Sequence, residues 1–209
     1  GSVPLIGFAG APWTILCYVI QGGGSKTFDR ALDFINEHPD LAHKLLSKVT
    51  DATIEYLSAK ADAGVHAVQL FDSWAGLLEQ EEYREFSHAY NKKIIQALSK
   101  RLPTILFPKD RGAELGQLMD AGSAAIGIDW TIEPEEARKL TQNKITLQGN
   151  LDPSLLFEDE QTIREATRKM IDRFGAQRYI ANLGHGILPE TPVENAIAFI
   201  ETVKSYKVG

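Results

Sequence analysis

Short apolar runs and longer helical patterns alternate along the whole chain. The apolar runs are rich in Val, Ile, Leu and Phe and lack strict polar/apolar alternation, which is typical of strands buried on both faces of a sheet. Alternation of strand and helix predicts parallel strands joined by right-handed crossovers. The predicted strands span residues 3–8, 67–71, 104–107, 124–128, 145–147 and 179–181.

Apolar residues at three- to four-residue spacing predict the helices between these strands. Pro39 near the start and Gly64 at the end delimit one long helix, and Pro134 marks the start of another. The stretch GGGS at residues 22–25 predicts a helix stop followed by a restart with Ser25 as cap. The helical patterns span residues 12–24, 38–64, 81–102, 112–122, 133–143, 159–175 and 191–206.

The ends of the predicted strands bear on the choice between a closed (β/α)8 barrel and an open doubly wound sheet. A barrel enzyme builds its site from the carboxyl ends of many strands, whereas an open sheet concentrates polar groups at one switch point. Every strand here ends in polar or glycine-rich residues, which favours the α/β TIM barrel. These ends are residues 10–13, 72–73, 109–110, 129–130, 148–150 and 182–185.

A full barrel needs eight strands and about 250 residues. The chain has 209 residues, six predicted strands and a strand pattern almost at its first residue. We therefore expect a single domain over residues 1–209 that is an incomplete barrel lacking two leading β/α units. Neither nucleotide-binding fingerprint, GxGxxG after a first strand or GxxxxGK[ST], occurs in the sequence.

The amino-acid composition limits the kinds of molecule that this protein is expected to bind. Hydrophobic residues make up 44% and charged residues 24% of the chain, and its net charge is −6 without a basic run. These values predict a globular protein without a nucleic-acid partner. No apolar stretch approaches the roughly 20 residues that span a bilayer. We therefore expect no membrane partner. Cys17, the one cysteine, cannot form an internal disulfide, so we expect a cytoplasmic protein.

Three polar side chains stand out at or after the strand ends, and each has a structural alternative. His185, between two glycines, is either a solvated turn residue or a proton-exchanging group beside a ligand. Ser73 binds a ligand or caps a helix, and a Ser-His-Asp hydrolase is disfavoured because GxSxG is absent. Tyr18, early in a helical stretch, is otherwise a half-buried aromatic residue.

Aspartates 72, 110, 129 and 152 follow strands, where such residues commonly cap the next helix or bind backbone amides. In another barrel any of them would also suit a metal. However, neither HxH nor HExxH occurs in the sequence, so no metal is expected.

Five motifs occur in the order PLIGFAGAPWTILCYVIQGGGS, LFDSWAG, IGIDWT, TLQGNLDP and YIANLGHGILP. Together they resemble the uroporphyrinogen decarboxylase family over about residues 3–202. The resemblance implies strands three to eight of a (β/α)8 barrel and a homodimer. It also implies decarboxylation of the four acetate side chains of uroporphyrinogen III to coproporphyrinogen III, in heme biosynthesis, without a metal or organic cofactor.

The same resemblance assigns substrate-binding residues. Tyr18 matches a tyrosine near the reacting acetate, Ser73 a hydroxyl that binds a substrate carboxylate, and His185 a histidine on the polar rim of the substrate. Phe8 and Phe71 match aromatics that line the apolar part of the cleft. Residues 109 and 110, a lysine and an aspartate, match a family loop without an assigned role.

The family's RQAGR arginines and its essential aspartate lie on the first two barrel units, and RQAGR does not occur here. The catalytic aspartate is therefore expected outside this chain, and we expect the chain alone to be inactive. One alternative is a non-catalytic fragment of that enzyme. Another is a zinc-dependent methyltransferase of the same superfamily, but LFPKD lacks the HxC motif of those enzymes.

Overall fold

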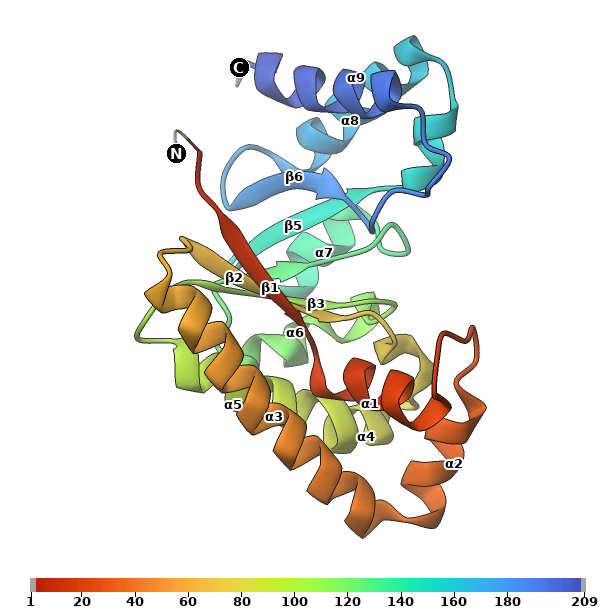
Figure 1. The fold of residues 1–209 in the computed structure, drawn as a ribbon. Helices are drawn as coiled ribbons and strands as arrows, with labels where there is room; N and C mark the ends of the chain where they lie inside the picture. Colours follow the sequence, from red (N-terminus) through yellow and green to blue (C-terminus); the bar gives the residue numbers. More distant parts are fainter. Residues whose placement is uncertain (1–2, 208–209) are drawn as a thin grey trace. The chain divides into compact units, whose positions relative to one another are not determined.

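The computed structural model describes residues 3–207 and has an α/β fold (Figure 1). Each of the six predicted strands is present, with shifted ends. The first strand begins only at Ile6, after Pro4, and the fifth extends to Leu151. The strands are β1 (Ile6–Gly10), β2 (Ala67–Asp72), β3 (Thr104–Pro108), β4 (Ala125–Gly127), β5 (Thr146–Leu151) and β6 (Tyr179–Leu183).

The helical patterns also form helices, although two of them are divided. The prediction over residues 81–102 becomes α4, a π-helical segment and α5, and the prediction over 112–122 becomes short 3-10 and α turns. The helices are α1 (Pro12–Gln21), α2 (Asp29–Glu37), α3 (Pro39–Asp62), α4 (Gln80–Tyr83), α5 (Ala89–Leu98), α6 (Leu115–Leu118), α7 (Pro134–Leu140), α8 (Glu160–Phe174) and α9 (Val193–Ser205). The short turns are η1 (Ala75–Leu77), η2 (Arg84–His88), η3 (Gly112–Glu114), η4 (Met119–Ala121) and η5 (Pro153–Phe157).

The chain divides into two compact units. The first contains Gly1–Arg111 and Gln117–Ile126, and the second contains Gly112–Gly116 and Gly127–Gly209. Within residues 3–207, no helix is both long and apolar enough to cross a membrane.

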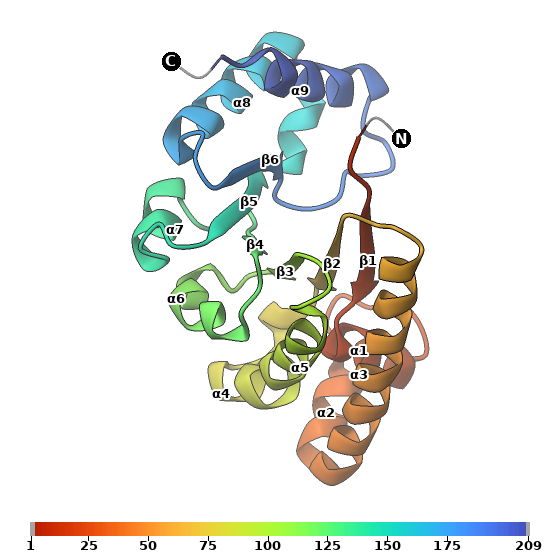
Figure 2. The same cartoon turned by 90° about the vertical axis from the view of Figure 1, so that its left-hand side faces the viewer.

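In the first unit, parallel strands pair in the order β1-β2-β3-β4. Side chains of a strand point alternately to the two faces of its sheet. Helices α3 and α5 pack on one face of this sheet and not on the other. Figure 2 shows α3 and α5 side by side on the same face. The buried core on that face contains Ala9, Ala11, Leu57, Val68, Leu70, Ile94, Ile95, Leu98, Leu106 and Ala121.

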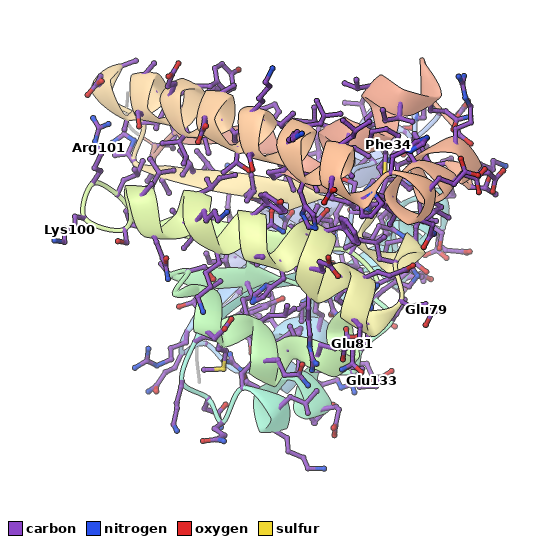
Figure 3. All side chains as sticks on the ribbon, turned by 90° about the horizontal axis from the view of Figure 1, so that it is seen from below. Phe34, Glu79, Glu81, Lys100, Arg101 and Glu133 are labelled. Atoms are coloured by element: carbon purple, nitrogen blue, oxygen red, sulfur yellow. The ribbon has the colours of Figure 1, made fainter. Side chains whose placement is uncertain are left out.

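Figure 3 shows α3 running alongside α5, with Arg101 at the end of the pair. There Arg101 donates a hydrogen bond to Asp62, which closes the helix pair at its exposed end. The opposite end of the layer carries Glu79, whose backbone N–H donates to Glu82 at 2.9 Å in a capping box that starts α4.

The GGGS stretch separates α1 from α2 as predicted, but the restart is later than expected. Gly22 ends α1 with a left-handed backbone, φ 79°, which glycine adopts without strain. Ser25 Oγ accepts hydrogen bonds from the N–H groups of Thr27 and Phe28 at 3.2 and 3.1 Å. Ser25 therefore caps the turn before the helix, and α2 itself begins at Asp29.

In the second unit, β5 and β6 pair in parallel, with Asn150 opposite Asn182. Ile163, Thr167, Met170 and Phe174 form the buried stripe of α8, at the three- to four-residue spacing expected of an amphipathic helix. This helix packs on β5 and on α9. This packing fixes the carboxyl ends of β5 and β6, where the polar residues 148–150 and 182–185 lie.

Candidate functional site

The segment of residues 72–78, which we call the β2 loop, follows the carboxyl end of β2 and carries Ser73. Ser73 is half-buried, and its hydroxyl has no hydrogen-bond partner among residues 3–207. The 3-10 turn that follows, Ala75–Leu77, has Trp74 at its N-cap position and no side-chain cap. The helix-cap alternative for Ser73 is therefore wrong, and its hydroxyl is left available to a ligand.

Two side chains of α1 hold the backbone of Trp74, the residue after Ser73. Trp13, which is fully buried, donates from Nε1 to the carbonyl oxygen of Trp74 at 2.9 Å. Thr14 Oγ1 accepts a hydrogen bond from the N–H of Trp74 at 3.4 Å. The same hydroxyl donates to Asp72 Oδ1 at 3.1 Å, so one threonine joins both neighbours of Ser73.

Asp72 is fully buried on the helix-facing side of the sheet. In addition to Thr14, it accepts hydrogen bonds from Ser87 Oγ and from Asn91 Nδ2, the latter at 2.9 Å. Burial raises the pKa of Asp72 above its ordinary value, while these three donors and the charge of Arg111 oppose the rise. The expectation that this aspartate caps the next helix is therefore wrong, since its partners are buried side chains of other elements.

Arg111 fixes the other end of the β2 loop. Its Nε and Nη2 donate to the carbonyl oxygen of Ala75 at 3.1 and 2.8 Å, and Nη2 also donates to that of Leu78. The guanidinium lies 4.6 Å from the ring centre of Tyr83, which adds a cation–π contact. The loop that carries Ser73 is thus held at its start by Asp72 and at its end by Arg111.

Lys109 and Asp110 form an ion pair, with 2.6 Å between Nζ and Oδ2. Asp110 also packs closely on the β2 loop, because a Cβ atom at Gly76 would lie 2.6 Å from Asp110 Cβ. Only glycine therefore fits at position 76, and this segment after β3 packs against the β2 loop.

Two groups of aromatic rings contain predicted site residues of the first unit, and one of them includes Trp74 of the β2 loop. Tyr18 is 45% exposed and contacts Phe28 and Trp74 edge-on, with ring centres 5.2 and 6.4 Å apart. Phe71 contacts Phe8 and Phe107 edge-on, at 5.8 Å in both cases, on the sheet face away from the core. Phe8 and Tyr18 are the exposed members of these two groups, whereas Phe28 and Phe107 are buried.

His185 belongs to the second unit, where it is exposed and lies just after β6. The two glycines beside it differ. A Cβ atom at Gly184 would lie 2.8 Å from Trp130 Cε3 and 2.9 Å from Trp130 N, whereas one at Gly186 would have no neighbour within 4 Å. Gly184 is therefore required by the close approach of the chain to Trp130.

Asn150, also in the second unit, organises the segment that Gly184 approaches. It is buried, and its Nδ2 donates to the carbonyl oxygens of Asp129 and Ile132 at 2.9 and 2.8 Å. Asp129 accepts from the N–H of Thr131 at 2.9 Å, and Asp152 accepts from the N–H of Ser154 at 2.8 Å. These two aspartates confirm the expectation that acids after the strands bind backbone amides.

Four of the five predicted site residues, Tyr18, Ser73, Phe8 and Phe71, belong to the first unit, where Phe8 contacts Phe71 and Tyr18 contacts Trp74, the residue after Ser73. Sequence reasoning did not identify the residues that support them, which are Thr14, Ser87, Asn91 and Arg111. They occupy ordinary helix or loop positions, and no local pattern marks them. Within the described part of the chain, no group of three His, Cys, Asp or Glu residues is arranged to hold a metal ion.

Comparison with known proteins assigns the chain to a family. The model of the family described as Uroporphyrinogen decarboxylase (URO-D) matches residues 1–206. The chain is 55% identical to the uroporphyrinogen decarboxylase of Christiangramia forsetii over 206 residues, which cover 99% of this chain and 60% of that protein. It is 41% identical to the human protein of the same name, covering 99% of this chain and 58% of that one. The chain thus spans about 60% of the length of these relatives.

Solved structures with the same fold are more distant in sequence. A methyltransferase from Methanosarcina mazei superposes with a TM-score of 0.83 at 20% identity, over 98% of this chain and 59% of that one. A B12-independent methionine synthase from a Shewanella species has a TM-score of 0.66 at 14% identity, over 98% and 63% of the two chains. These superpositions show that the chain shares the fold of the matching parts of both proteins. From the match over residues 1–206, the chain belongs to the uroporphyrinogen decarboxylase family.

Proposed function

We propose that this chain is the part of a uroporphyrinogen decarboxylase that holds the tetrapyrrole by Tyr18, Ser73, His185, Phe8 and Phe71. The main support for the proposal is the family match over residues 1–206, with 55% identity to a protein of that name. The β2 loop adds support, because hydrogen bonds hold the residues on both sides of Ser73, Asp72 and Trp74, while the Ser73 hydroxyl itself has no partner among residues 3–207. The methyltransferase and methionine synthase neighbours are below 25% identity and bear on the fold alone.

The proposed reaction removes CO2 from the four acetate side chains of uroporphyrinogen III and yields coproporphyrinogen III. Loss of CO2 needs an acceptor for the electrons of the breaking C–C bond, and a pyrrole ring protonated on carbon is such an acceptor. The protein then has to position the macrocycle, stabilise its positive charge and supply protons. This scheme uses neither a metal nor an organic cofactor.

Each site residue has a distinct role in this proposal. The Ser73 hydroxyl donates a hydrogen bond to a substrate carboxylate, and exposed Tyr18 lies near the reacting acetate. His185 binds the polar rim of the substrate, and Phe8 and Phe71 contact its apolar part. We assign the charge-stabilising aspartate to the portion of the family that this chain does not match.

The proposal extends to the architecture and setting of the protein. Residues 1–209 correspond to strands three to eight of a (β/α)8 barrel and act as a single domain. The working protein is a cytoplasmic homodimer whose ligand is an anionic tetrapyrrole. In this scheme, residues 1–209 alone do not catalyse the reaction.

The test uses the whole protein with uroporphyrinogen kept reduced, and follows release of CO2 and the mass of the product. A hydrogen bond to a charged group contributes about 1.5–3 kcal/mol, so Ser73→Ala should lower kcat/KM about 10- to 100-fold. Ser99→Ala is the matched control, because that serine lies in an exposed turn after α5 and donates only to Gln96 O. Absence of CO2 release by the unaltered protein would contradict the proposed function.

A second experiment tests the expectation about the isolated chain. Residues 1–209 and the whole protein are assayed side by side under the same reducing conditions. We expect activity only in the whole protein. Equal turnover by the shorter chain would show that its own residues suffice for catalysis.

A further inference from the structure

The buried carboxylate of Asp72 joins four elements behind the proposed site. It stands at the end of β2 and accepts hydrogen bonds from Thr14 of α1, Ser87 of η2 and Asn91 of α5. Asn91 Nδ2 also donates to Ser87 Oγ at 3.1 Å, so the donors are linked to each other. A buried carboxylate is costly unless it is fully hydrogen-bonded, and such networks fix their members in one arrangement.

Two of these donors lie within or just after the π-helical segment η2. A π-turn inserts an extra residue into a helix and rotates the residues on either side of it. Ser87 lies within η2 and Asn91 lies one turn later, and both donate to Oδ2 of Asp72.

The network continues from Asp72 to the proposed site through Thr14. Its hydroxyl donates to Asp72 and accepts from the N–H of Trp74, so Ser73 lies between two residues that share this partner. Thr14 and Tyr18 are one helical turn apart on α1, and the ring of Tyr18 contacts Trp74. The position of Asp72 is thereby linked to both the Ser73 hydroxyl and the Tyr18 ring.

We infer that Asp72 is a positioning residue that holds Ser73 and Tyr18 in place for the substrate through Thr14 and Trp74. Asp72 does not touch the substrate, because it is buried on the helix-facing side of the sheet. The inference rests on the proposed function for the identity of the substrate. The hydrogen bonds that link Asp72 to the β2 loop are present whatever the substrate is.

The variant Asp72→Asn tests the inference in the whole protein. Asparagine keeps only one acceptor oxygen, so it cannot accept from Thr14 on one side and from Ser87 and Asn91 on the other at the same time. A neutral side chain also costs less to bury, which offsets part of the lost hydrogen bonding. Displacement of the site by such a change is expected to lower kcat/KM for uroporphyrinogen about 10- to 100-fold.

A double-mutant cycle distinguishes positioning from a general loss of stability. If Asp72 acts through Ser73 and Tyr18, Asp72→Asn lowers kcat/KM by a smaller factor in the Ser73→Ala background than in the unaltered protein, because only the part that acts through Tyr18 remains. If the two losses multiply, the inference is overturned. Asp62→Asn is the matched control, since that carboxylate is 71% exposed and pairs with Arg101 at the surface.

Hydrogen exchange provides a readout that does not require activity. We expect amides of residues 72–78 to exchange faster in Asp72→Asn, while those of α8 and α9 keep their rates. Unchanged exchange in the β2 loop would refute the positioning role whatever the kinetics. Loss of exchange protection throughout the first unit would also refute it, because the effect would then be global.

Thr14→Val is a second variant in case Asp72→Asn does not fold. It keeps the branched shape of the side chain but removes the hydroxyl that links Asp72 to Trp74. The expected result is faster exchange at Trp74 and a lower kcat/KM, in the same direction as for Asp72→Asn. If the unaltered protein does not decarboxylate uroporphyrinogen, the proposed function fails, and the exchange data still decide the role of Asp72.

Discussion

The two glycines that flank His185 offer a matched pair of substitutions. Gly184 approaches Trp130 so closely that an added Cβ would lie 2.8 Å from Cε3, 2.9 Å from the backbone N and 3.1 Å from Asp129 Cα. Two of these three atoms belong to the backbone, so a side-chain rotation cannot relieve the contact. Gly186 has no atom within 4 Å of the same added group and no positive φ.

Gly184→Ala should therefore lower the free energy of unfolding by about 1–3 kcal/mol, the usual cost of forcing an extra carbon into a packed position. Gly186→Ala should leave it unchanged or raise it by about 0.4–1 kcal/mol, because alanine restricts the unfolded chain. The difference between the two variants is the quantity that the structure predicts.

Denaturant unfolding of both variants in the whole protein measures this difference, and kinetics with uroporphyrinogen follow the effect on His185. Gly184→Ala has to move the backbone on one side of His185, so we expect a raised KM, whereas Gly186→Ala should behave like the unaltered protein. Equal stability of the two variants would refute the packing argument. A stability loss with unchanged KM in Gly184→Ala would separate the packing of this turn from substrate binding.

Three further predictions concern buried polar groups. Asn150→Ala removes the donor for two buried carbonyl oxygens, so it should lower the free energy of unfolding in a denaturant titration by about 1–3 kcal/mol. Asn36→Ala serves as its control, because the Asn36 amide donates on an exposed helix face. Burial, followed by the nearby charge of Asp72, raises the pKa of the Cys17 thiol, so a thiol reagent should label it only as fast as the protein opens; rapid labelling of the folded protein would contradict this. Because the pKa of Asp72 is raised in the folded state, its contribution to stability is greatest below about pH 4, the ordinary value, and is lost as pH rises through the folded-state pKa. The unfolding free energy of the unaltered protein relative to Asp72→Asn should therefore fall as pH rises from about 4, and a rising difference would show the opposite shift.

The strands and most helices could be predicted because they depend on local composition and periodicity. Apolar runs without alternation marked β2 and β3, and the spacing of Ile163, Thr167 and Met170 marked α8. The prediction was less accurate where one pattern fits two structures. A four-residue repeat through Phe86 and Tyr90 fits an unbroken helix as well as one with a π-turn, and only contacts with other elements select between them.

The residues of the candidate site could be proposed from the sequence only in part, for the same reason. Ser73 and His185 could be proposed as site residues because they follow strands, and the motifs around them resemble one family. Nothing in the sequence marks Thr14 or Asn91, because their role depends on a carboxylate that lies 58 and 19 residues away in the chain. The sequence allows Ser73 to cap a helix equally well, and only the structure shows that the following turn lacks a side-chain cap.

Hydrophobic periodicity and turn chemistry were enough to establish the order of strands and helices, the parallel α/β class and the residues that end each strand. The chain also holds the motifs that place it in its family. Only the tertiary structure buries Asp72 among Thr14, Ser87 and Asn91. It also packs Gly184 closely against Trp130, whereas a Cβ atom at Gly186 would have no neighbour within 4 Å. Such contacts join residues far apart in the chain, and their energies depend on burial and distance, which exist only in the folded protein.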